Sequence, residues 1–368
     1  MRRIGVKTVA LIALTSAGLV AIIIGGVALR SGPARPSPDA VVAAGSPGAL
    51  VLVDDGSSRR EAASGVAVLQ GRLPLGARDR FRVGSITKMF VAVVVLQLVD
   101  EHRLRLGDTV ERWLPGLVPD GGRITVRELL GHTSGLADYA DDAAFLRRTV
   151  AQPRRRWTPR ELVRVAIAGG SVARPGERFA YASTNYVLLG LVVERATGTS
   201  LERQLGRRIL TPLGLHDTSF APGPLIPGRS VHGYTPTEYD GIVNGLATAR
   251  DRSTVSTSWA WAAGSIVSTA PDLSRFLGAV LQGRLLPPRL LELMRPAPGA
   301  RYGLGLAAFR TPCGTAVGHT GAILGTVSAA WSSPDGRRRV IAMSNSHPLS
   351  PPAEAAFRRL LDASFCGA

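Results

Sequence analysis

The sequence predicts an α/β (α+β) sandwich, in which an antiparallel sheet built from both chain ends is flanked by helices and interrupted by a mainly helical inserted domain. Six runs have the composition of strands, two near the start of the chain and four near its end: 48–54, 65–70, 302–308, 314–318, 324–332 and 337–344. Turn sequences join neighbouring runs, Gly-Ser-Ser at 56–58 and Pro-Asp-Gly at 334–336. Because the two groups of strands stand far apart along the chain, the region between them is predicted to be an insertion.

Helical patterns account for most of the remaining body. Within the insertion, residues 106–254, they are short and broken by Pro and Gly: 125–130, 159–168, 185–197 and 201–210. A further helix is predicted from Ala270, with Asp272 near its positive end, and another over residues 353–364. The helix predicted from Ser85 to about Glu101 is apolar on nearly all sides, which indicates that it is buried in the body.

Residues 1–30 are predicted to be either a signal peptide or an N-terminal membrane anchor, and the sequence does not distinguish between these two interpretations. Arg2, Arg3 and Lys7 precede an uncharged stretch, residues 8–29, that is long enough to span a bilayer. Basic residues before such a stretch favour a cytoplasmic N-terminus, so we expect an extracytoplasmic body, secreted or anchored to the cell membrane. Residues 31–45 are predicted to be a linker, and residues 46–368 the folded domain.

The composition narrows the function classes. The chain has 368 residues, 45% of them hydrophobic, and a formal net charge of +17. The basic residues are scattered and no nucleic-acid motif appears, so no nucleic-acid partner is expected. A basic surface is expected to be solvated or attracted to the anionic cell envelope. The six histidines are widely spaced without a His-Glu-x-x-His motif, so neither a metal nor another cofactor is expected.

Only two cysteines occur, Cys313 and Cys366, both in the last part of the chain. In an oxidising compartment they are expected to form one disulfide that holds the C-terminus. Two free buried cysteines are the alternative.

Lys88 is the most informative residue of the chain. Only two lysines occur, Lys7 and Lys88, beside many arginines. An ammonium can lose its proton when desolvated, whereas a guanidinium cannot. Lys88 follows Ser85 by three residues, so the two share one face of a helix, and an uncharged amine could accept the serine proton. The alternative is a capping Ser and a Lys that reaches solvent, but the surrounding apolar run favours the catalytic pair.

Two later segments could complete such a site. Tyr181 precedes the helical run 185–197, and a phenol near Lys88 could accept and return protons; a core tyrosine is the alternative. His319, Thr320 and Gly321 lie on a candidate strand. There Thr320 could hydrogen-bond a carboxylate, His319 could be cationic or a hydrogen-bond donor, and the glycine would let a substrate lie close to the strand.

The order of these motifs, Ser-x-x-Lys at 85–88, Tyr at 181 and His-Thr-Gly at 319–321, resembles the serine β-lactamase and penicillin-binding superfamily. It is most similar to the branch that holds class C β-lactamases, serine D-alanyl-D-alanine carboxypeptidases and esterases. Further similar segments stand at 131–136, 263–269 and 302–305. The resemblance covers about residues 81–345 and implies a β-lactamase/transpeptidase-like fold.

Carried over by position, the resemblance implies that Ser85 is the acylated nucleophile, Lys88 its proton acceptor and Tyr181 the acid and base that serves the leaving amine. It implies that six residues bind the substrate: Ser183, Trp259, His319, Thr320, Gly321 and Ala322. Among them, the His-Thr-Gly strand matches the motif that binds the substrate carboxylate. The backbone N–H groups of Ser85 and Ala322 match an oxyanion hole.

Trp259 matches a position that lines the acyl pocket, and His132 is expected to have a structural role. Two departures from the family pattern are visible. Ser183 stands where the family usually has Asn, which is longer and carries an amide. His319 stands where true lactamases have Lys, a form found among the carboxypeptidases of the branch.

The resemblance therefore implies a serine hydrolase that acts through an acyl-enzyme, as a D-alanyl-D-alanine carboxypeptidase-like peptidase of the cell envelope. The alternatives are an esterase or β-lactamase of the same fold, or a catalytically silent envelope binding protein. The expected partner is a small peptide, ester or β-lactam substrate.

Overall fold

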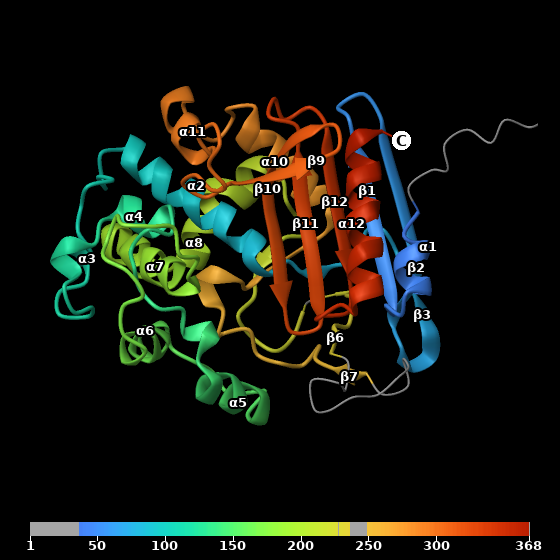
Figure 1. Ribbon diagram of the computed structural model, residues 1–368, viewed down its shortest axis with the longest axis horizontal. Coiled ribbons are helices and arrows are strands. Elements are labelled where there is room, and N and C mark those ends of the chain that lie inside the picture. The colour runs from blue at the N-terminus through green and yellow to red at the C-terminus, as the bar shows by residue number, and fades with distance from the viewer. Residues whose placement is uncertain (1–36, 227, 236–248, 368) are drawn as a thin grey trace, which may run out of the picture. The chain divides into compact units, whose positions relative to one another are not determined.

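The computed structural model describes residues 37–226, 228–235 and 249–367. Within them, the central element is a seven-stranded sheet with the order β3-β2-β1-β12-β11-β10-β9 and antiparallel neighbours (Figure 1). Its strands are β1 (Gly48–Asp54), β2 (Arg59–Val68), β3 (Leu73–Pro74), β9 (Ala307–Thr311), β10 (Gly314–Ile323), β11 (Thr326–Ser332) and β12 (Arg339–Ser344). The prediction of an antiparallel sheet built from both chain ends is confirmed.

The helices lie on both faces of this sheet, and most come from the stretch between its two groups of strands. They are α1 (Asp39–Ala43), α2 (Thr87–Asp100), α3 (Val110–Trp113), α4 (Val126–Leu130), α5 (Ala143–Ala151), α6 (Pro159–Ala168), α7 (Ser183–Thr197), α8 (Leu201–Leu205), α9 (Thr211–Leu213), α10 (Ala270–Leu281), α11 (Pro288–Met294) and α12 (Pro351–Cys366). Short strands form two smaller sheets: β4 (Phe81–Arg82), β8 (Ile266–Ser268) and β5 (Ser219–Phe220), then β6 (Tyr234–Thr235) and β7 (Arg250–Asp251).

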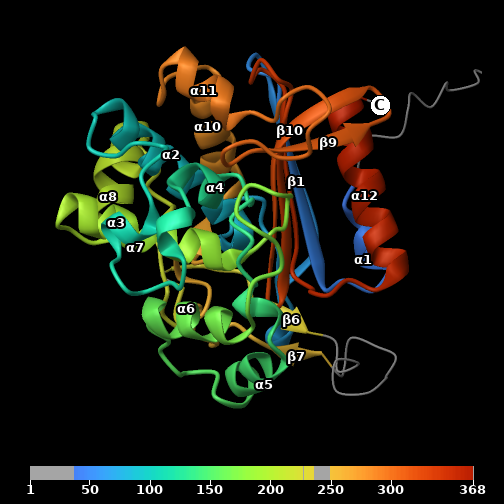
Figure 2. The same ribbon diagram turned by 60° about the vertical axis from the view of Figure 1, so that its left-hand side comes forward.

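Alternation along β1 divides its side chains between two apolar cores. Leu50 and Leu52 belong to the larger core, which the helical region covers. Val51 and Val53 belong to a smaller core on the opposite face, beneath α12. Figure 2 shows α12 and α1 on one face of the sheet and the remaining labelled helices on the other. All seven residues of β1 are buried, as expected for a strand that is covered on both faces.

A helix lies inside the segment that the sequence predicts to be a linker. Helix α1 places Val41, which is fully buried, in the smaller core. The folded body therefore begins before residue 46. The predicted signal peptide or anchor, residues 1–30, lies outside the described residues. The helices of the described ranges do not include one with both the length and the hydrophobicity of a membrane span.

Helix α2 is buried, as its composition predicts: Thr87 through Leu96 and Leu98 are shielded from solvent. It begins two residues later than predicted. Gly84–Ile86 form a 3₁₀ turn, and the α-helix starts at Thr87. The backbone of Gly84 has φ +55°, a conformation outside the right-handed helical region, so the tighter turn lets the chain leave β4.

Helix α6 agrees closely with its sequence pattern, whereas two other predicted runs differ from the observed elements. Helix α6 occupies the predicted range, because Thr158 and Glu161 form a capping box at its start. The run predicted as one helix over 201–210 is instead α8 followed by a π-helical turn, Gly206–Leu210. The strand predicted over 302–308 is displaced to β9. A side chain at Gly303 would meet the carbonyl oxygen of Arg295 at 2.3 Å, so this stretch lies tightly against the end of α11.

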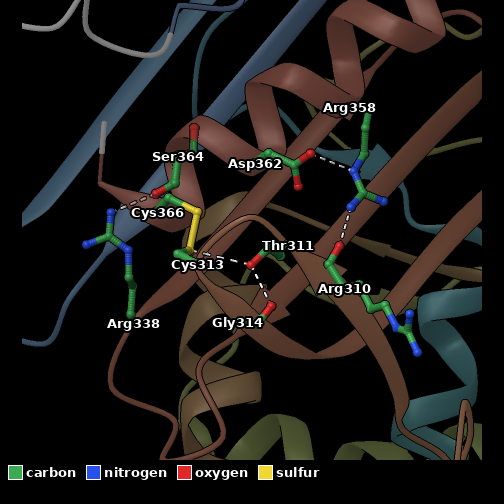
Figure 3. Close-up of a disulfide and its surroundings, with 9 residues drawn as sticks. All are labelled: Arg310, Thr311, Cys313, Gly314, Arg338, Arg358, Asp362, Ser364 and Cys366. Atoms are coloured by element: carbon green, nitrogen blue, oxygen red, sulfur yellow. Dashed lines mark hydrogen bonds and ion pairs between the residues drawn. A yellow bond between two sulfur atoms is a disulfide. The ribbon is translucent and has the colours of Figure 1, made fainter.

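Cys313 and Cys366 form a disulfide, with 5.6 Å between their Cα atoms. Figure 3 shows that it joins the turn between β9 and β10 to the end of α12. Beside it, the guanidinium of Arg358 pairs with Asp362 and donates to the carbonyl oxygen of Arg310, so α12 is bound to β9 at two levels (Figure 3). The prediction of a disulfide that holds the C-terminus is confirmed.

Candidate active site

Ser85 and Lys88 form the hydrogen-bonded pair that their spacing predicts. Lys88 Nζ donates to Ser85 Oγ at 2.9 Å and to the carbonyl oxygen of Ala263 at 3.0 Å. Lys88 is fully buried, whereas Ser85 is only half-buried. None of the ion pairs formed among residues in the described ranges includes Lys88. The amine therefore reaches the hydroxyl from within the core, without a carboxylate partner in that part of the chain.

The turn that carries Ser85 lies directly against strand β10. A side chain on Gly84 would stand 2.8 Å from the backbone nitrogen of Ala322, and one on Gly321 would stand 1.9 Å from the carbonyl oxygen of Val83. Glycine is therefore required on both sides of this contact. The close approach brings the backbone of Ser85 near that of Ala322, the two N–H donors that the resemblance assigns to an oxyanion hole.

Tyr181 lies beside the lysine, on the extended segment that leads into α7. The centre of its ring is 4.9 Å from Lys88 Nζ, and the residue is 39% exposed. Its hydroxyl makes no hydrogen bond with any residue of the described part of the chain. The structure thus brings all three predicted catalytic residues together, with the phenol open towards solvent.

His319 is buried in β10, and both of its ring nitrogens are engaged. Nδ1 contacts the carbonyl oxygen of Thr320, and Nε2 lies 3.1 Å from the hydroxyl of Tyr302. Burial lowers the pKa of His319 to about 3, and the charge of a protonated Lys88 contributes to the shift. Of the two predicted roles, the cationic one does not fit this environment. A neutral ring donates from Nδ1 and accepts the Tyr302 proton at Nε2.

The remaining strand residues alternate as a strand requires. His319 and Gly321 are buried, whereas Thr320 and Ala322 are exposed and so face the same side. The Thr320 hydroxyl is therefore accessible to a ligand that lies against β10.

Ser183 occupies the first position of α7. Its backbone N–H donates to Asp138 Oδ2 at 2.8 Å. The other oxygen of Asp138 accepts from the N–H of Ala140 at 3.0 Å. This arrangement fixes a carboxylate beside a residue of the predicted substrate site. No sequence pattern indicates Asp138, because it belongs to no motif and its neighbour Ser183 is 45 positions away.

Trp259 is half-buried and packs on the larger core, four residues before Ala263, whose carbonyl binds Lys88. Its indole N–H has no hydrogen-bond partner in the described ranges. The assignment of Trp259 to the acyl pocket stays a prediction.

Two residues contribute more than the sequence indicated. His132, expected only to be structural, stacks on Tyr181 with 4.3 Å between ring centres. Tyr302 contacts His319, and its ring is 4.9 Å from that of His132. Both belong to segments that support the family resemblance, at 131–136 and 302–305, so their motifs were visible although their contacts were not.

Comparison with known proteins agrees with this geometry. The sequence profile of the family named Beta-lactamase matches residues 34–365. Penicillin-binding protein 4* of Bacillus subtilis is 30% identical over 189 residues, which are 50% of this chain and 40% of that protein. The chain spans about half the length of the curated relatives it matches.

Two solved structures match over nearly their whole length. A D-stereospecific amidohydrolase from Streptomyces sp. is 37% identical, with a TM-score of 0.80 over 90% of this chain and 97% of that one. The D-amino acid amidase from Ochrobactrum anthropi SV3 is 28% identical, with a TM-score of 0.77 over 89% of this chain and 95% of that one.

Proposed function

The chain belongs to the Beta-lactamase family and has the fold of its serine hydrolases, and from that membership we propose that it cleaves the amide bond that follows a D-amino acid residue. The solved structures with the same fold and 37% and 28% identity are named for amide hydrolysis with D-stereospecificity or on D-amino acids. The proposed reaction passes through an ester between the substrate's acyl group and Ser85.

The neutral state of His319 is the observation that carries this choice of substrate. With both ring nitrogens engaged and its pKa lowered to about 3, His319 supplies no positive charge to a substrate's carboxylate. The Asp138 carboxylate, which accepts a hydrogen bond from the backbone N–H of Ser183, adds negative charge beside that residue of the predicted substrate site. This electrostatic environment favours a substrate with a free amine over one that ends in a carboxylate.

The proposed first step is acylation. Lys88 accepts the proton of Ser85 as Oγ attacks the carbonyl carbon, because its Nζ lies within hydrogen-bonding distance of that hydroxyl, at 2.9 Å. The N–H groups of Ser85 and Ala322 hold the oxygen of the tetrahedral intermediate. Tyr181 then gives a proton to the leaving amine as the C–N bond breaks. In deacylation, Tyr181 takes back a proton from the water molecule whose oxygen attacks the ester carbonyl. Lys88 returns its proton to Ser85 Oγ as the ester bond breaks and the acid leaves.

Turnover of the D- and L-enantiomers of an amino acid amide tests the proposal. We expect D-phenylalanine amide to be hydrolysed, L-phenylalanine amide and Nα-acetyl-D-phenylalanine amide to be poor substrates, and Ser85→Ala to abolish both turnover and labelling by a fluorophosphonate. After fluorophosphonate treatment, intact-mass spectrometry would show one phosphonyl group on the wild-type protein and none on the variant. Equal hydrolysis rates for D- and L-phenylalanine amide, or activity that survives in Ser85→Ala, would contradict the proposal.

A D-alanyl-D-alanine carboxypeptidase is the second candidate. The exposed Thr320 hydroxyl on β10 favours it, because it can hydrogen-bond a terminal carboxylate, and so does the similarity to Penicillin-binding protein 4*. Release of D-alanine from an N-blocked D-alanyl-D-alanine peptide, faster than hydrolysis of D-phenylalanine amide, would favour this candidate. Hydrolysis of a short-chain ester and of penicillin in the same assay tests the esterase and β-lactamase hypotheses. No turnover of any of these compounds, together with no fluorophosphonate or penicillin adduct on Ser85, would favour a silent binding protein.

We also propose that the domain works outside the cytoplasm, after export by residues 1–30. The disulfide supports this location, since such bonds persist in oxidising compartments. Fusion of residues 1–45 to alkaline phosphatase, which is active only after export, tests the proposal: an inactive fusion would contradict it.

A further inference from the structure

His132 is a fully buried histidine in a left-handed backbone conformation next to the proposed catalytic centre. It follows the end of α4, with a φ of +57° and no exposed surface. Non-glycine residues seldom adopt this conformation, and such positions cluster at functional sites.

The hydrogen bonds of His132 fix which nitrogen carries its proton. Nδ1 lies 3.2 Å from the backbone N–H of Ala182 and 3.1 Å from Asn185 Nδ2. The amide of Asn185 is oriented by Ser134, whose hydroxyl donates to Asn185 Oδ1 at 2.6 Å. Both neighbours of Nδ1 are therefore donors, so Nδ1 is an acceptor. Burial lowers the pKa of His132 well below its usual value, so the ring is neutral and its proton resides on Nε2.

The ring of His132 also supports the catalytic phenol. It stacks on Tyr181 with 4.3 Å between ring centres and 28° between planes. It meets Tyr302 nearly edge-on, at 4.9 Å and 71°. Nε2 has no nitrogen or oxygen partner among the described residues, so aromatic rings are its immediate surroundings. An N–H group can point at a ring face in such an arrangement.

We propose that His132 is the positioning residue of Tyr181. Its Nδ1 accepts the backbone N–H of Ala182, the residue after Tyr181, and the face of its imidazole ring holds the phenol ring of Tyr181. The inference rests on the proposed hydrolase function, in which Tyr181 gives its proton to the leaving group. Tyr181 needs such support because it is 39% exposed and its hydroxyl has no hydrogen bond within the described ranges. Without the stacked ring, the phenol samples directions that do not lead to the reacting atoms.

His132→Asn separates this role from a general contribution to folding. Asparagine tolerates the left-handed backbone and keeps an acceptor near the position of Nδ1, but it lacks the ring. His102→Asn is the matched control. His102 has the same φ of +57°, is exposed and follows the far end of α2, about 20 Å of helix from Ser85.

For His132→Asn we expect kcat on a D-aminoacyl anilide to fall by about tenfold to a hundredfold, with KM changed less than about twofold. The p-nitrophenyl ester of the same acyl group should lose less, because its leaving group departs without a proton. His102→Asn should match the wild type on both substrates. A kcat for His132→Asn equal to the wild type, or equal losses on anilide and ester, would overturn the proposal.

A second measurement on the unaltered protein remains decisive if His132→Asn does not fold. Long-range ¹H–¹⁵N spectra of the histidine rings should show His132 with its proton on Nε2 at pH 7 and still neutral at pH 5. A proton on Nδ1, or a charged ring, would refute the inference. Wild-type protein that hydrolyses nothing defeats the proposed function and the role of His132 together. Normal wild-type turnover with an unimpaired His132→Asn defeats the role of His132 alone.

Discussion

At Lys88, an arginine could keep the charge but not the proposed chemistry. The side chain is fully buried, and its Nζ lies between Ser85 Oγ and the carbonyl oxygen of Ala263. A guanidinium is larger, planar and always protonated, so it cannot accept a proton there. This reasoning explains why a chain so rich in arginine has a lysine at this position.

Lys88→Arg should therefore reduce kcat by at least about 10²-fold, because a correctly placed general base contributes 10²–10⁴-fold. Steady-state kinetics on D-phenylalanine amide, beside the rate of fluorophosphonate labelling, would measure the loss. Arg203→Lys, an exchange between the same two residue types at an exposed position of α8, is the control and should be silent. Activity near the wild type in Lys88→Arg would rule out proton acceptance by this amine.

The individual residues of the site were more predictable than their contacts. Ser85, Lys88 and Tyr181 stand in recognisable motifs, and the structure brings them together. The neutral state of His319 could not be read from its motif, because it depends on burial and on Tyr302, 17 residues earlier. Asp138 reaches the site through a backbone N–H, an interaction that no side-chain pattern records.

Among the elements, the contact between the turn 84–86 and strand β10 controls the site most directly. The space there is so small that a side chain on Gly84 would stand 2.8 Å from the backbone of Ala322. Any displacement of this turn moves one proposed oxyanion donor relative to the other.

Gly84→Ala tests this contact. The added methyl group also has to accept a φ of +55°, so we expect a loss of about 1–3 kcal/mol in the free energy of unfolding. We further expect kcat/KM to fall by about 10²-fold, the usual cost of losing one oxyanion donor. Urea denaturation and steady-state kinetics provide the two measurements. Gly122→Ala, where a methyl group meets nothing within 4 Å, is the control, and similar effects in both variants would remove Gly84 from this role.

Element boundaries were predictable where a local signal marks them. The start of α6 has a capping box, and its predicted range is the observed one. The displaced strand near residue 302 had no such signal. Its path depends on the backbone of Arg295 in the preceding helix–loop segment, a tertiary contact that overrides local strand propensity.

For the whole molecule, buried neutral histidines couple stability to pH. His319 has a folded pKa of about 3 against 6.5 for the free side chain. The unfolded chain therefore binds a proton first as the pH falls. The stabilisation is complete above pH 6.5 and is lost progressively between pH 6.5 and 3.

We expect the free energy of unfolding to fall by about 1.4 kcal/mol per pH unit in this window for that one group. Urea denaturation at pH 7, 6 and 5 measures the slope. His319→Gln, which cannot titrate, should have a shallower slope than the wild type, whereas exposed His102→Asn should keep it. Identical slopes for wild type and His319→Gln would show that His319 is not buried in its neutral form.

Strand β1, the third strand from one edge of the sheet, pairs with β12 in a register that matches Ala49 with Ser344. Nearly three hundred residues separate these partners, so the nascent N-terminal hairpin leaves the ribosome long before its neighbour exists. The middle of the sheet closes only after synthesis of the C-terminal part. Until then β1 presents an unsatisfied backbone edge, and any chaperone that escorts the nascent chain has this edge to shield.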